Sequence, residues 1–99
     1  MDPNAYIVSK IRLAREVSGM PIATLARRAG MTPNSLSESL RGNRSPTAAE
    51  LVELALVLDI DLICFVEKER YDEIIERRRQ VIEEFGTGAG TSDLRQVRR

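Results

Sequence analysis

Prolines and glycines divide this 99-residue chain into short segments in which apolar residues recur every three to four positions, as in a helix. The prolines stand at the start of these segments and the glycines stand after their end. Each of the four prolines stands at or just before the start of such a stretch, where its missing N–H would have no partner. Each of the first four glycines follows such a stretch, at the position where a helix often ends with a residue in the left-handed conformation, which glycine adopts without steric strain. The positions are Pro3, Pro21, Pro33 and Pro46, and Gly19, Gly30, Gly42 and Gly86. No stretch alternates as a strand does, so the pattern predicts an all-α fold.

Five helical segments are expected, at about 3–17, 21–29, 33–41, 48–58 and 62–85, the last with a bend near 67–70. Asp2 and Thr32 are predicted N-caps, and Thr47 with Glu50 forms a predicted capping box. The side chains expected to face the core are Ile7, Ile11, Ala14, Val17, Ile22, Leu25, Ala26, Leu36, Leu40, Leu51, Leu54, Ala55 and Leu58.

The net charge of zero hides a division of charge along the chain. Residues 1–46 carry seven basic and three acidic side chains, whereas residues 47–85 carry five basic and eleven acidic ones. A basic N-terminal half favours a polyanionic partner there, although chance clustering in a small set of charges gives the same pattern.

The residue types exclude several kinds of site. With no histidine and a single cysteine, the chain cannot form an internal disulfide, a usual zinc site or a Ser-His-Asp triad. Its carboxylates are scattered and no glycine-rich phosphate loop is present, so we expect neither an enzyme nor a cofactor or metal. Cys64, within an apolar run, is expected to be buried.

No apolar stretch is long enough to span a membrane and no secretory signal is visible, which favours a cytoplasmic protein.

The segments 21–29 and 33–41 have the features of a helix-turn-helix. Both are short, Gly30 permits the sharp turn between them, and the small Ala26 permits their close approach. From Ile22 to Gly42, the sequence resembles the DNA-binding motif of the Cro/C1-type (XRE) repressors. The shared features are Leu25-Ala26, Gly30 four residues later, a capping Thr32, an inward Leu36 and the closing Arg41-Gly42. The resemblance covers roughly residues 5–66 and departs from the family at Ile22, where glutamine is frequent, and at Ser39, where a large apolar residue is usual.

The resemblance implies a five-helix repressor-like domain whose segment 33–41 enters the major groove of double-stranded DNA. The side chains that it implies for base contacts are Thr32, Asn34, Ser35, Ser37 and Glu38. Asn34 suits adenine and Glu38 suits the amino group of cytosine. Helix capping by Thr32 and plain surface roles for Ser35 and Ser37 are the alternatives. The residues expected at the DNA backbone are Arg12, Arg27, Arg28, Arg41, Asn43 and Arg44, with the minor groove as an alternative for Arg44.

The chain is expected to comprise a DNA-binding domain over 1–66, an amphipathic C-terminal helix over 67–85 and a disordered, glycine-rich tail over 86–99. The apolar stripe of that helix is Tyr71, Ile74, Ile75, Val81, Ile82 and Phe85, interrupted by Arg78. This stripe is predicted to pair with the same stripe of a second copy and so to form a homodimer. The alternative is that the helix packs against the DNA-binding domain of its own chain. The function expected is a transcriptional regulator, in particular a repressor that binds an inverted-repeat operator. The competing hypothesis is a protein-interaction module, such as an antitoxin that binds a partner toxin.

Overall fold

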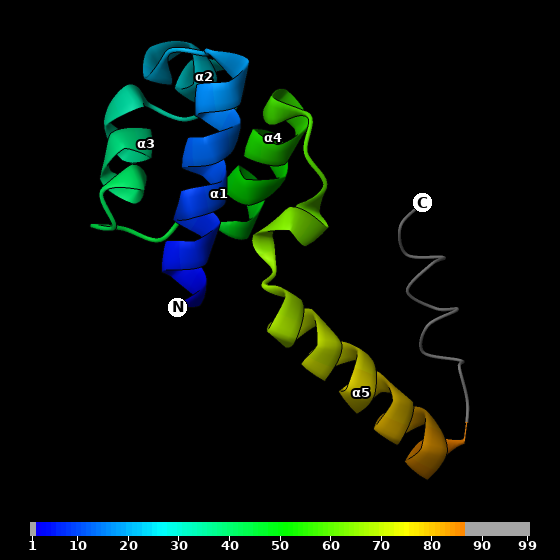
Figure 1. The fold of residues 1–99 in the computed structure, drawn as a ribbon. Helices are drawn as coiled ribbons and strands as arrows, with labels where there is room; N and C mark the ends of the chain where they lie inside the picture. Colours follow the sequence, from blue (N-terminus) through cyan, green and yellow to red (C-terminus); the bar gives the residue numbers. More distant parts are fainter. Residues whose placement is uncertain (1, 87–99) are drawn as a thin grey trace. The chain divides into compact units, whose positions relative to one another are not determined.

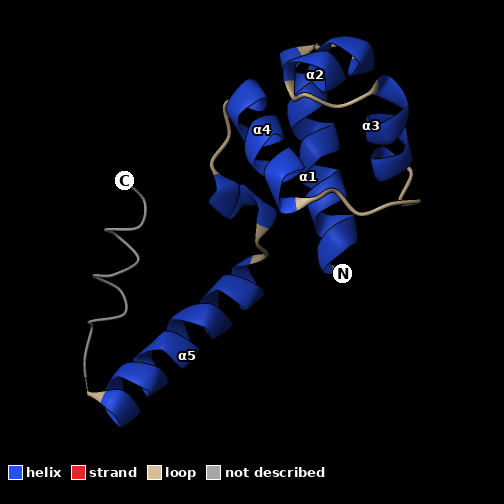
Figure 2. Cartoon of the chain, turned by 180° about the vertical axis from the view of Figure 1, so that it is seen from behind, coloured by secondary structure: helices blue, strands red, loops and turns tan. Residues whose placement is uncertain are grey.

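The computed structural model describes residues 2–86, and every regular element among them is helical (Figures 1 and 2). In chain order the elements are α1 (Pro3–Ser18), α2 (Ile22–Arg28), α3 (Pro33–Leu40), α4 (Ala48–Leu58), a 3-10 helix η1 (Leu62–Phe65) and α5 (Lys68–Phe85). The predicted all-α, helix-turn-helix fold class is confirmed. The chain divides into two compact units between Glu67 and Lys68, and each is described by itself.

The predicted caps are present and explain where the helices begin. Asp2 accepts a hydrogen bond from the Ala5 N–H at 3.1 Å, which starts α1. Thr47 and Glu50 bond to each other's backbone N–H at 3.1 and 2.9 Å, completing the capping box of α4. These bonds satisfy N–H groups that have no partner within the helix.

A single apolar core holds the first unit together. α1 and α2 each pack against both α3 and α4, and η1 packs against α1 and α4. Ile11, Leu25, Leu36 and Leu54 come from four different helices and are fully buried. The side chains of α3 that face this core therefore fix the helix from one side, which leaves its opposite side for other contacts.

The prediction was wrong at three positions of the first unit: Val17, Val8 and Cys64. Val17 is 80% exposed, whereas Val8, which the expected core does not include, is buried. α1 ends at Ser18, so Val17 lies in its last turn, beyond the part of the helix that the core covers. Cys64 is exposed because η1 is a 3-10 helix with three residues per turn and directs only Phe65 into the core.

The segment predicted as one bent helix over 62–85 is two separate helices. η1 ends at Phe65, and Val66 follows with extended backbone angles before α5 starts at Lys68. None of the side chains of α5 is buried. Lys68 and Asp72 form an ion pair of 2.9 Å, and the hydrogen bond that this carboxylate accepts raises the pKa of Lys68.

The predicted tail lies outside the described residues from position 87 onward. Over residues 2–86, none of the helices combines the length and the apolar character that crossing a membrane requires.

Candidate nucleic-acid interface

A tight turn joins α2 to α3 and sets the angle between them. Gly30 has a φ of 72°, a conformation that side chains other than glycine rarely adopt. The Met31 N–H donates to the Ala26 carbonyl at 2.8 Å, so the chain reverses directly over the end of α2. Ala26 is fully buried and has no side chain beyond Cβ to hold the helices apart. The predicted roles of Gly30 and Ala26 in the turn agree with this geometry.

α3 has a buried side and an outer side. Leu36, Ser39 and Leu40 are buried. The residues that begin the helix, Thr32, Pro33 and Asn34, are exposed, and Ser35, Ser37 and Glu38 are half-buried. The predicted base-contacting residues therefore all lie on α3 or its cap and away from the fully buried positions.

Thr32 and Ser35 already bond to each other at the start of α3. The Thr32 hydroxyl oxygen accepts from the Ser35 N–H at 3.0 Å, as an N-cap does. The same hydroxyl donates to the Ser35 Oγ at 2.9 Å. Both side chains thus fix the first turn of α3, which leaves the Asn34 amide as the polar group of that turn that is not used in capping it.

Glu38 is held by two residues that follow α3. One of its carboxylate oxygens accepts from the Arg41 guanidinium and the other from the Asn43 side-chain amide, each at 2.9 Å. The Asn43 N–H also donates to the Glu38 carbonyl at 2.9 Å. Three residues predicted to contact DNA therefore form one cluster, in which Arg41 partly neutralises the Glu38 charge.

Arg44 is bound within the domain. Its guanidinium donates to the Ser39 hydroxyl at 2.8 Å and to both carboxylate oxygens of Glu50 at 3.0 and 3.2 Å. Ser39 is fully buried, so Arg44 supplies a hydrogen-bond partner for its hydroxyl. The family usually has a large apolar residue at this position, which would need no such partner. Arg44 joins α3 to the start of α4, a role that sequence reasoning missed. The Arg44–Glu50 ion pair spans a loop, and no helical spacing signals it.

Arg44→Ala is expected to lower the free energy of unfolding by about 1–3 kcal/mol, because it removes charged hydrogen bonds and leaves Ser39 without this donor. Urea denaturation measures the loss. Arg41→Ala is the matched control, since its ion pair is exposed and is expected to contribute less than about 1 kcal/mol. Equal losses for the two variants would contradict the structural role of Arg44.

The pKa of Glu50 is lowered from its ordinary value of 4.5. The main cause is the hydrogen bond from the Thr47 backbone N–H; burial opposes it, and the Arg44 guanidinium adds to the lowering. The folded carboxyl therefore holds its proton less tightly than the unfolded one. Its contribution to stability is complete above the unfolded pKa and is lost as the pH falls through the folded value.

Glu50→Gln should remove this pH dependence. Between about pH 6 and pH 3, the wild-type protein is expected to lose more stability than the variant, because only the wild type has to protonate this carboxylate. Denaturant melts at several pH values measure both curves. Parallel curves for the two proteins would show that Glu50 is not the group responsible.

The remaining basic residues of the predicted interface fall into two groups. Arg27 and Arg28, in the last turn of α2, are exposed. Arg12, on α1, donates from its guanidinium to the Leu40 carbonyl at the end of α3. Arg12 thus satisfies a carbonyl that lacks a helical partner and ties α1 to α3.

Comparison with known proteins identifies this arrangement. A family model described as Helix-turn-helix matches residues 11–63, more than half of the chain. The chain belongs to the XRE-type helix-turn-helix family. This match confirms the resemblance seen in the sequence and supports a DNA-binding regulator.

Two individual proteins resemble this helix-turn-helix chain. The uncharacterised HTH-type transcriptional regulator y4dL of Sinorhizobium fredii (strain NBRC 101917 / NGR234) is 33% identical over 58 residues, which are 59% of this chain. The chain spans only 30% of that relative's length. The solved SinR protein/SinI protein complex contains a chain that matches with a TM-score of 0.58 over 93% of both chains. At 19% identity, this second match shows the fold alone.

No metal centre is formed by the residues that the structure describes. Over 2–86, groups of three or more Cys, Asp or Glu side chains that could hold an ion are absent.

Proposed function

We propose that this helix-turn-helix protein binds double-stranded DNA sequence-specifically as a homodimer and acts as a cytoplasmic transcriptional repressor at an inverted-repeat operator. The proposal depends most on one observation: α3 is anchored to the core on one side and carries exposed polar groups on the other. An α-helix presented in this way fits the major groove. Repression requires only that the bound protein occupies the operator, and we propose a binding role without enzymatic activity.

The outer side of α3 would contact base edges. Asn34 is the strongest candidate, because its amide matches the N6 and N7 groups of adenine and is exposed at the start of the helix. Thr32, Ser35 and Ser37 are proposed to contact bases or nearby phosphates while Thr32 and Ser35 cap the helix. Glu38 would act less as an acceptor from cytosine and more as the group that holds Arg41 and Asn43 in place.

The DNA backbone would be bound on both sides of α3. Arg41 and Asn43 follow the helix, and the exposed Arg27 and Arg28 end the preceding one. Guanidinium groups and amides at these positions suit phosphate oxygens. Arg12 and Arg44 have partners within the domain, and we propose that they position α3.

Asn34→Ala is expected to cost about 1–3 kcal/mol at the one base pair that Asn34 contacts and to relax the preference there. Binding to a preferred duplex and to its single-base variants, followed by fluorescence anisotropy, measures this. Arg28→Ala is the control, because removing a phosphate-binding group weakens the binding of all these duplexes alike. If Asn34→Ala also weakens every duplex equally, Asn34 has no base-contacting role.

The second candidate function is a protein-interaction module, which would use the amphipathic α5 to hold a different protein. The structure matched above contains two named proteins, SinR and SinI, and for this chain that is only a reason to test the alternative. Binding to random duplex DNA at low salt separates the two hypotheses. The proposed regulator binds such DNA through its basic helices, whereas a module that recognises only protein does not.

A further inference from the structure

The charges at the two ends of α5 oppose the dipole of the helix. Its first turn includes the basic Lys68 and Arg70, and its last turn includes the acidic Glu83 and Glu84 with no basic residue. A helix dipole favours acidic groups at the N-terminus and basic groups at the C-terminus. Glu69 is the single residue of the first turn with the favourable sign. Ion pairs within α5, from Lys68 to Asp72 and from Arg70 to Glu73, offset this cost at the N-terminal end. The dipole still disfavours Glu83 and Glu84 at the C-terminal end.

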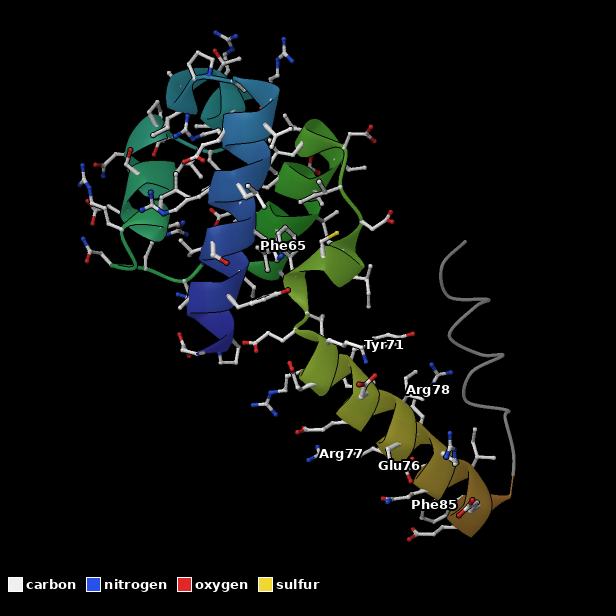
Figure 3. All side chains as sticks on the ribbon, in the orientation of Figure 1. Phe65, Tyr71, Glu76, Arg77, Arg78 and Phe85 are labelled. Carbon is white, nitrogen blue, oxygen red and sulfur yellow. The ribbon has the colours of Figure 1, made fainter. Side chains whose placement is uncertain are left out.

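These four charges border an apolar surface, the α5 face, which consists of Tyr71, Ile74, Ile75, Val81, Ile82 and Phe85. At 3.6 residues per turn, Arg70 and Glu84 lie along one edge of the face and Lys68 and Glu83 along the other. Arg78 lies within the face, and Figure 3 shows Tyr71 and Arg78 extending from the same side of α5. Five of the six apolar side chains are exposed, so a partner helix would find them accessible.

A second copy of α5 in parallel orientation would bring like charges together. In that arrangement one edge of the face lies beside the opposite edge of the second copy at the same height. Lys68 would then meet Arg70, and Glu83 would meet Glu84. Such like-charge contacts disfavour a pairing mode strongly, as they do in coiled coils.

We propose that two copies of α5 pair in antiparallel orientation through the α5 face. Each edge of the face then lies beside the same edge of the second copy, running in the opposite direction. Arg70 therefore lies near Glu84 of the second copy, and Lys68 lies near Glu83 of the second copy. The two-fold axis repeats each pair. It falls near Glu76, so the two copies of Arg78 are offset by four residues, about 6 Å along the helix. This inference rests on the proposed function, because it assumes that α5 joins two copies of the chain.

Charge reversal tests the orientation. Lys68→Glu with Arg70→Glu is expected to weaken self-association at least tenfold in low salt, measured by analytical ultracentrifugation. Both changes suit the helix dipole, which offsets the loss of the Lys68–Asp72 and Arg70–Glu73 ion pairs within α5. Adding Glu83→Lys and Glu84→Lys to the same chain should restore the dimer. In a parallel dimer the first pair of changes only exchanges one like-charge contact for another, so an unchanged dimer, or a failure of the four changes to restore it, overturns the proposal.

Disulfide formation gives a second, direct test. In a Cys64→Ser background, a Tyr71→Cys chain mixed with a Val81→Cys chain is expected to give a disulfide between the two, whereas neither variant cross-links with itself. A Tyr71→Cys disulfide between identical chains would show a parallel pair, and then the orientation is wrong while the proposed homodimer stands. A wild-type protein that remains monomeric in the ultracentrifuge would remove both the homodimer and this inference.

Discussion

Ile75→Asp should reduce the affinity for an inverted-repeat operator by about 10²–10⁴-fold. In the proposed homodimer, binding of the helix-turn-helix of one copy holds that of the second copy near its half-site. Linkage of this kind raises the affinity by about 10²–10⁴-fold. A carboxylate in the α5 face would replace an apolar contact and would lose its hydration when two copies associate, which disfavours the dimer. Operator binding measured by anisotropy and mass measured by ultracentrifugation should therefore change together.

The matched control for this experiment is Gln80→Asp, which introduces the same charge on the side of α5 away from its apolar face. This variant should dimerise and bind the operator nearly as the wild type does. The DNA-binding domain of both variants should remain folded, because the core lies within residues 2–67. If Ile75→Asp dissociates the dimer and the operator affinity stays within a few-fold of the wild-type value, the two copies bind their half-sites independently. The proposal of a linked dimer is then wrong.

The second large effect is expected from salt. A dimer that binds roughly 6–8 phosphates should lose about three orders of magnitude or more in affinity between about 50 and 200 mM salt, because each neutralised phosphate releases counterions. A plot of the logarithm of the binding constant against the logarithm of salt concentration should be linear. Its slope gives the number of phosphates that the protein neutralises.

Individual arginines can be assigned from the same plots. Arg27→Ala should make the slope shallower by about one for each phosphate that Arg27 neutralises in the complex, since its exposed side chain is proposed to bind phosphate. Arg12→Ala should mainly affect stability, because its guanidinium holds the Leu40 carbonyl. A nearly flat salt plot for the wild-type protein would contradict DNA binding through these helices.

The sequence predicts the fold well because its strongest signals are local. Asp2, Thr32 and Thr47 cap their helices through bonds to residues three positions away, a spacing visible in any sequence. Leu36 and Leu40 are buried as the helical period requires. Gly30 occupies the left-handed conformation that the turn between α2 and α3 needs.

The predictions that were wrong or incomplete depend on contacts between elements. The DNA-backbone role of Arg44 stays a prediction, but its structural contacts were missed, because Ser39 and Glu50 come together with it only in the folded domain. The exposure of Cys64 depends on whether its segment forms an α-helix or a 3-10 helix, and an apolar run does not distinguish them. The bonds from Arg41 and Asn43 to Glu38 likewise depend on the turn that ends α3.

Selection of preferred duplexes from a random pool by the purified protein tests most directly whether α3 recognises DNA sequence. We expect enrichment of an inverted repeat whose half-sites lie about one helical turn apart, with one position losing its preference in the Asn34→Ala protein. A pool that shows no enrichment after repeated rounds, from protein that is folded and binds DNA, would contradict this expectation.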